Sequence, residues 1–189
     1  MNITTDISRV VIDTGRLTLR AFVQSDLADF YAYASAPGVG EMAGWHHHES
    51  IETSEIILRL FIEGKNVCAI HHKEANRVIG SLGFHDSWAN EDKVYSHLKA
   101  KEIGYVLAKD FWGHGLMPEA VKAIIDYGFN ELGIEAITCG HFLENNQSKR
   151  VIEKIGFEFV KQSEYYSKQM NKTFEDMKYI LLKEVFNRR

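Results

Sequence analysis

Cysteine and proline are both scarce in this chain, with two of each among 189 residues. A chain of this length does not need disulfides to complete its core, and Cys68 and Cys139 lie in apolar, strand-like runs, so we expect both to be buried thiols. His141 follows Cys139 at the spacing that puts both side chains on one face of a strand, which keeps a catalytic thiol–imidazole pair as a minor hypothesis. Pro37 and Pro118 are too far apart to mark a hinge between domains.

The chain also lacks an excess of positive charge and any long hydrophobic run. Its 22 Lys and Arg against 26 Asp and Glu give a net charge of −4, which argues against nucleic acid as a main partner. Apolar stretches such as 56–58 and 60–62 are far shorter than the ~20 residues that cross a bilayer, so no membrane partner is expected. The first ten residues lack the basic start and apolar core of a secretion signal, and we expect a cytoplasmic location.

Composition and periodicity predict one folded domain over residues 1–189, with a mixed α/β (α+β) architecture. Apolar residues make up 45% and charged residues 25% of the chain, which is typical of a globular protein. The segment 16–22 alternates apolar and polar residues as a half-buried strand does, and 118–132 repeats apolar residues at helical spacing. The predicted strands, about seven, are 16–22, 66–72, 77–84, 102–107, 134–142, 157–161 and 177–183. The predicted helices, about four, are 26–34, 50–64 (starting at Ser50 or Thr53), 118–132 and 148–155. The three successive strands between 66 and 107 indicate an antiparallel meander, so the sheet is expected to be mostly antiparallel.

The most informative stretch joins the end of the 102–107 strand to the helix that begins at Pro118. It contains Gly113-His114-Gly115, and such a joint aims several free backbone N–H groups at one point in front of the positive end of the helix dipole. This arrangement can hold an anion or a pyrophosphate, although a plain tight turn explains the same glycines. Proline at 118 replaces the third glycine of a dinucleotide-binding motif, and no P-loop motif occurs.

Two motifs in this order resemble those of a known family. The first is Gly113-x-Gly115 before Pro118-Glu119-Ala120, and the second is the run ENNQSKRVIEKIGF over residues 144–157. Together they resemble the GCN5-related N-acetyltransferases (GNAT), in the branch similar to the RimJ/RimL ribosomal-protein-alanine N-acetyltransferases. The resemblance extends from about Thr14 to Leu182, which is nearly the whole chain.

The resemblance implies an enzyme that uses acetyl-CoA and no metal. Its pyrophosphate would rest on backbone amides of the glycine loop, and its pantetheine arm would lie where the strand 103–107 parts from the strand 136–142. The residues that the resemblance places at the donor are Tyr105, Val106, Leu107, Gly113, His114, Gly115, Leu116, Asn145 and Ser148. One departure concerns Asp110, because the family usually has Gln or Arg three residues before the first glycine. Glu119 would repel phosphate if it pointed inward, so we expect it to point away.

Acetyl transfer to an amine requires an amine without its proton and a stabilised thiolate leaving group. Glu102 is the first candidate for the base, since the resemblance puts it near the thioester, with a solvated strand-end carboxylate as the alternative. His85 is the second candidate, because an imidazole titrates near neutral pH, although a loop histidine without a role is also possible. By resemblance, Ser148 stabilises the thiolate; a simple helix N-cap is the competing interpretation. Asn145 would contact the pantetheine or the chain turn.

The resemblance places the acceptor side at the loop that holds Trp45 and the histidines at 46–48, which would line the mouth for the substrate, with His85 and Glu102 also facing it. Consecutive histidines at 46–48 project in different directions and have no further ligand at helical spacing, so we expect no metal site there. Tyr165 and Tyr166 could line the mouth or simply pack.

The leading hypothesis is direct transfer from acetyl-CoA to a primary amine in a ternary complex. The amine would belong to a protein N-terminus or to a small molecule. A non-catalytic acyl-CoA-binding regulatory domain is the alternative, and a protein that binds another phosphate compound is a third hypothesis. Edge strands make a homodimer plausible.

Overall fold

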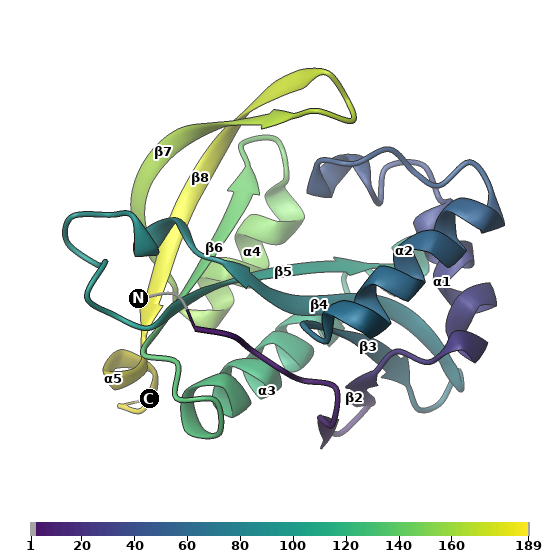
Figure 1. Ribbon diagram of the computed structural model, residues 1–189, viewed down its shortest axis with the longest axis horizontal. Helices are drawn as coiled ribbons and strands as arrows, with labels where there is room; N and C mark the ends of the chain where they lie inside the picture. The colour runs from purple at the N-terminus through teal and green to yellow at the C-terminus, as the bar shows by residue number, and fades with distance from the viewer. Residues whose placement is uncertain (1–2, 189) are drawn as a thin grey trace.

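The computed structural model describes residues 3–188 as an eight-stranded sheet with helices on both faces (Figure 1). The strand order across the sheet is β1-β2-β3-β4-β5-β6-β8-β7. The strands are β1 Val11–Asp13, β2 Leu17–Ala21, β3 Val67–His72, β4 Arg77–Asp86, β5 Ala100–Leu107, β6 Ala136–Phe142, β7 Glu158–Ser167 and β8 Lys172–Leu182. The helices are α1 Leu27–Ala34, α2 Ile51–Gly64, α3 Leu116–Asn130, α4 Asn146–Ile155 and the short α5 Lys183–Phe186.

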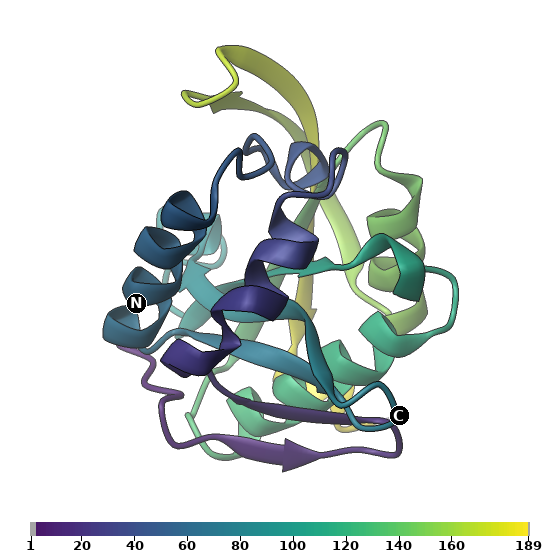
Figure 2. The ribbon, with the colours of Figure 1, turned by 90° about the vertical axis from the view of Figure 1, so that its right-hand side faces the viewer.

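The sheet lies between two hydrophobic layers. Successive side chains of β3 pack alternately into one layer and the other. Cys68 and Ile70 pack in the layer that includes α3 and α4, whereas Val67 and Ala69 pack in the layer that includes α1 and α2. Figure 2 shows these two helix pairs on opposite sides of the strands. Because β3 is covered on both faces, its first four residues are all apolar and buried, and only the two histidines at its end are partly exposed. Both cysteines are buried and free, as the sequence predicts.

All neighbouring strands pair antiparallel except β5 and β6, which are parallel. Their register covers only three positions, from Ala100 opposite Ala136 to Glu102 opposite Thr138. Beyond that point β5 continues to Leu107 and β6 to Phe142 without pairing to each other. The sheet therefore opens in its middle, as the family resemblance implies.

Several element boundaries differ from those predicted. β1 is an additional strand, and the closing hairpin β7–β8 is longer than the predicted 157–161 and 177–183. Helix α3 begins at Leu116 rather than Pro118, because Gly115 takes the N-cap position and a proline is tolerated in a first turn. Helix α4 begins at Asn146 with Asn145 as its cap, so the cap is not Ser148. Among residues 3–188, no helix is long and apolar enough to cross a membrane.

Candidate functional site

A cleft of about 1200 Å³ lies where β5 and β6 diverge. The glycine loop Gly113–Gly115 lines one end, and His85 and Glu102 line the cleft near the last paired rung of β5 and β6. The loop between α1 and α2, including Trp45, lines a further wall. The cleft therefore brings together the glycine loop, the candidate bases and the expected acceptor side.

The glycine loop presents backbone N–H groups at the N-terminus of α3. Gly113 and Gly115 have φ values of +79° and +74°, a left-handed conformation that glycine adopts without steric cost. Within residues 3–188, the amides of Gly113, His114 and Gly115 donate to no backbone carbonyl. These free donors lie in front of the positive end of a 15-residue helix, which suits a negatively charged group.

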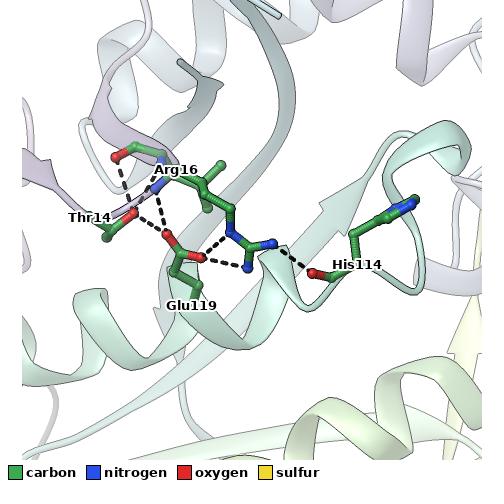
Figure 3. A network of polar contacts seen from close by, with 5 residues as sticks. Thr14, Arg16, His114 and Glu119 are labelled. Carbon is green, nitrogen blue, oxygen red and sulfur yellow. Dashed lines mark hydrogen bonds and ion pairs between the residues drawn. The ribbon is translucent and has the colours of Figure 1, made fainter. Parts of the chain in front are cut away.

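Glu119, in the first turn of α3, points toward the β1–β2 turn and not toward the loop amides (Figure 3). Its Oε2 atom pairs with the Arg16 guanidinium at 2.7 Å, and its Oε1 atom accepts from the Thr14 hydroxyl at 2.5 Å. Burial alone would raise the pKa of Glu119, but these hydrogen bonds and the nearby Arg16 charge lower it. The carboxylate is therefore ionised, and its negative charge is balanced by the Arg16 guanidinium. Its side chain points away from the loop amides, as expected from the sequence.

Glu102 lies at the last paired rung of β5, where the cleft begins. Its side chain is 26% exposed, its Oε2 accepts a long hydrogen bond from the Thr138 hydroxyl at 3.3 Å, and its Oε1 lies 3.8 Å from Lys178 Nζ. Lys178 makes its closer ion pair, at 2.7 Å, with Asp176. Burial raises the pKa of Glu102, Lys178 opposes that shift and Asp176 adds to it. A carboxylate with a raised pKa is better suited to accept a proton than an ordinary one.

His85 lies directly opposite Glu102 in the β4–β5 register, so both side chains are on the same face of the sheet. It is part of β4, which continues to Asp86, and not of a loop. The imidazole leans across Gly104, where a Cβ atom would be 3.2 Å from the ring. Desolvation by the cleft walls, followed by the charge of Lys101, lowers the pKa of His85. A lowered pKa keeps the ring neutral, and therefore able to accept a proton, at neutral pH.

A pair of hydroxyl groups connects β5 to α4 across the cleft. The Tyr105 hydroxyl lies 2.9 Å from Ser148 Oγ. Asn145 caps α4 by accepting from the Ser148 amide at 3.0 Å, and its own amide donates to the Met42 carbonyl at 3.1 Å. Asn145 therefore makes the expected contact with the chain turn, and its contact with the pantetheine arm stays a prediction.

The structure gives no support to a Cys139–His141 pair. His141 uses Nε2 to contact the Tyr179 hydroxyl at 3.1 Å and Nδ1 to contact the Phe142 carbonyl at 2.8 Å. Burial is the main reason that the pKa of the Cys139 thiol is raised far above its usual range, and the Glu102 charge adds to it. A neutral thiol without a basic partner is a poor nucleophile.

The loop between α1 and α2 is held by a carboxylate that the sequence did not single out. Glu41 accepts from the Gly38 amide at 2.6 Å and contacts His47 Nδ1 at 2.7 Å. Burial would raise the pKa of Glu41, but hydrogen bonds from His47 and from backbone amides lower it to about 2. His48 instead contacts Ser54 Oγ at 2.7 Å, so the neighbouring histidines do turn in different directions.

The β7–β8 hairpin covers this loop (Figure 1). The Ser167 hydroxyl donates to the Gly44 carbonyl at 2.7 Å, and a Cβ atom at Gly44 would lie 3.0 Å from the Tyr165 ring. Tyr165 lines the cleft together with Trp45, whereas Tyr166 is exposed and contacts Asn171. The Trp45 end of the cleft is therefore bordered by both the loop and the hairpin, which contact each other.

Comparison with known proteins agrees with this geometry. A family model described as an acetyltransferase (GNAT) domain matches residues 16–158. The chain belongs to this family. It is 29% identical over 153 residues to the uncharacterized N-acetyltransferase YoaA of Bacillus subtilis, covering 78% of this chain and 82% of that protein.

Two solved structures share the GNAT fold. An acetyltransferase of the GNAT family from Bacillus anthracis superposes with a TM-score of 0.80 at 23% identity, covering 93% of this chain and 99% of the other. Spermidine N-acetyltransferase from Vibrio cholerae, solved with CoA and spermine, superposes with a TM-score of 0.74 at 16% identity, covering 92% and 99%. Family membership and the relatives support an N-acetyltransferase rather than a non-catalytic binding domain, and GNAT enzymes take their acetyl group from acetyl-CoA.

Proposed function

We propose that this GNAT protein transfers an acetyl group from acetyl-CoA directly to a primary amine bound at the Trp45 end of the cleft. The observation that carries the proposal is the divergence of β5 from β6. It joins, in one cleft, a loop of unpaired amides and a carboxylate whose pKa is raised by burial. Anion binding and proton acceptance are the two tasks that this reaction requires of the protein.

The dimensions of the cleft suit an extended acyl carrier. The five residues of β5 beyond the paired rungs, 103–107, span about 17 Å at 3.3 Å per residue. Their edge toward β6 is unpaired, so it can bond to the amides of an extended pantetheine arm as one strand bonds to another. With the diphosphate on Gly113–Gly115, such an arm would run toward Glu102. Tyr105, Val106 and Leu107 would then form its wall.

Three side chains divide the proton chemistry. Acetyl-CoA supplies an acyl group on a good leaving group, and the amine nitrogen forms its new bond to the carbonyl carbon as the carbon–sulfur bond breaks. Glu102 accepts the proton that the amine loses, either directly or through a water molecule. Ser148, hydrogen-bonded to Tyr105, donates to the departing thiolate. No covalent enzyme intermediate is needed, which agrees with the raised pKa of the buried Cys139 thiol.

Two classes of acceptor fit this site. Resemblance to the RimJ/RimL branch favours the α-amine of a protein N-terminus, and the structure solved with spermine favours a small polyamine. A primary amine is cationic before it reacts, and Glu102, whose distance to Lys178 is 3.8 Å, is a carboxylate of the cleft wall that can attract it. The charge of Asp176 is already balanced by Lys178 at 2.7 Å. We therefore expect the substrate to enter as an ammonium ion. It passes one proton through Glu102 to solvent before it attacks, and Glu102 takes the second proton as the amide forms, while the departing thiolate is protonated from solvent.

The test combines ligand-induced stabilisation with turnover. A ligand at ~100 times its Kd stabilises a protein by about 2.7 kcal/mol, which for this size raises Tm by roughly 5–11 °C. We expect that shift with acetyl-CoA and with CoA but not with ATP or NAD. Release of free thiol should then follow when polyamines or N-terminal peptides are added. If neither CoA compound shifts Tm, the glycine loop does not bind the donor and the proposed function is wrong.

A further inference from the structure

A polar network ties the start of β2 to the glycine loop (Figure 3). Arg16 donates from Nε to Glu119 Oε2 at 2.8 Å and from Nη1 to the His114 carbonyl at 2.8 Å, and its Nη2 forms an ion pair with Glu119 Oε2 at 2.7 Å. The Arg16 amide donates to Glu119 Oε1 at 2.9 Å. The contact with His114 involves only its backbone, since the imidazole extends away from Arg16. One guanidinium thus connects the first turn of α3 to the loop before it.

The contact with the His114 carbonyl fixes a neighbouring amide. In a trans peptide the carbonyl oxygen and the next N–H are coplanar and point in opposite directions. The His114 carbonyl faces Arg16, which does not line the cleft, whereas Gly115 does. The Gly115 N–H therefore points away from Arg16 toward the cleft, and within the described chain it donates to no backbone acceptor. Arg16 keeps this donor aimed at the position of a bound anion.

Glu119 makes the arrangement rigid. Arg16 is 48% exposed, and a long side chain at the surface is normally mobile. Here the planar guanidinium is held on two of its nitrogens by a carboxylate that is itself fixed by Thr14, so the third nitrogen has a defined direction. The pair also cancels the negative charge of Glu119, which would otherwise oppose a phosphate at the start of α3.

We propose that Arg16 is a positioning residue that holds the glycine loop in the conformation that binds the diphosphate of acetyl-CoA. This inference rests on the proposed function and adds to it a residue remote in sequence from the loop. Because Arg16 acts through the loop, its effect should be specific to donors that carry a diphosphate. It should not alter the binding of the amine or the proton transfer at Glu102.

The experiment compares two acetyl donors, acetyl-CoA and S-acetylpantetheine, which lacks the diphosphate. In Arg16→Ala we expect the KM for acetyl-CoA and the Kd for CoA to rise about tenfold, the scale of one charge-assisted hydrogen bond. The kcat, the KM for the amine and the kcat/KM with S-acetylpantetheine should stay within twofold of the parent. Arg59→Ala is the matched control, since Arg59 is an exposed arginine that pairs with Glu55 on α2 and does not line the cleft.

Two further variants keep the test decisive if Arg16→Ala does not fold. Arg16→Lys keeps the charge but cannot contact Glu119 and His114 together in the same geometry, so it should raise the KM for acetyl-CoA by about threefold or more. Glu119→Gln should do the same, because it leaves Arg16 without its anchor.

An equal loss of kcat/KM with both donors would show that Arg16 supports only the fold. An unchanged KM for acetyl-CoA would show that Arg16 does not act on the loop. Either result overturns this inference but leaves the proposed function standing. If the parent protein neither binds CoA nor turns over either donor, the proposed function fails first and the inference with it.

Discussion

Replacement of Glu102 by glutamine tests the base most directly. The change keeps the size of the side chain and an oxygen that can accept from Thr138, but it removes the ability to take a proton. General base catalysis contributes roughly 10²–10⁴ in rate, or about 3–5 kcal/mol of transition-state stabilisation. His85 faces the same position from the neighbouring strand and can accept a proton in place of Glu102. We therefore expect a loss near the lower limit, about a hundredfold in kcat.

The same substitution has a predictable effect on stability. Burial raises the pKa of Glu102 in the folded protein, so the ionised carboxylate is more stable in the unfolded chain. The folded state consequently gains relative stability as pH falls through that raised pKa, and it carries a penalty above it. Glu102→Gln removes the penalty, and Lys178 keeps its shorter ion pair with Asp176. The variant should be at least as stable as the parent at pH 7–8. Its gain in unfolding free energy over the parent should become smaller near pH 4, where the parent's Glu102 is also neutral.

The assay follows thiol release from acetyl-CoA between pH 5.5 and 9, alongside thermal unfolding over the same range. In the parent, kcat/KM should fall as pH decreases through the raised pKa of Glu102. In Glu102→Gln this limb should be lost, and the residual activity should instead follow the protonation of His85, whose pKa burial lowers. Glu158→Gln, an exposed residue on β7, controls for the change in net charge. An unchanged pH profile, or a loss of activity that matches a loss of stability, would refute the role of Glu102 as base.

Three other substitutions test separate parts of the site. Gly113→Ala should lower the unfolding free energy by about 1–2 kcal/mol, because its backbone is left-handed, and should also weaken CoA binding. Gly133→Ala is the control, since Gly133 also has positive φ and no atom near an added Cβ. It should lose similar stability in thermal unfolding but keep its Kd for CoA. Ser148→Ala should lower kcat about tenfold with little change in the KM for acetyl-CoA; an unaltered kcat would exclude it from thiolate stabilisation. Cys139→Ser should retain activity within a fewfold, and acetylated Cys139 detected by mass spectrometry during turnover of the parent would contradict direct transfer.

Hydrophobic pattern predicted most of the fold because most elements bury a regular face. The strands β3, β4 and β5 each contain a largely apolar run of buried or half-buried residues, which in β5 begins only after Lys101 and Glu102, so these strands were readable from the sequence. The outer part of the β7–β8 hairpin is exposed on both faces and has no such pattern, which is why both strands were predicted too short. β1 escaped prediction for a similar reason, since it has three residues and Val11 is 69% exposed.

The site divides into a local part and a long-range part. Gly113 and Gly115 were found because a strand–loop–helix joint is written in consecutive residues. Arg16 was not singled out, because the two groups that give it a role, the His114 carbonyl and Glu119, are about a hundred residues away in the sequence. Ser148 could be read as a cap or as a functional hydroxyl, and only the folded chain shows that Asn145 takes the cap and that Ser148 meets Tyr105.

The three-rung junction between β5 and β6 also governs how the empty protein can move. Strands β1–β5 form one antiparallel block and β6–β8 another, and few main-chain bonds join the two blocks directly. Motions about this junction would widen or narrow the space between them, opposed mainly by the apolar layer that packs against both blocks. An extended molecule that binds the facing edges of β5 and β6 would connect the two blocks and restrict their relative motion. When such a ligand binds, amide hydrogen exchange should become slower in both blocks of strands. The slowing should include many amides that the ligand does not contact.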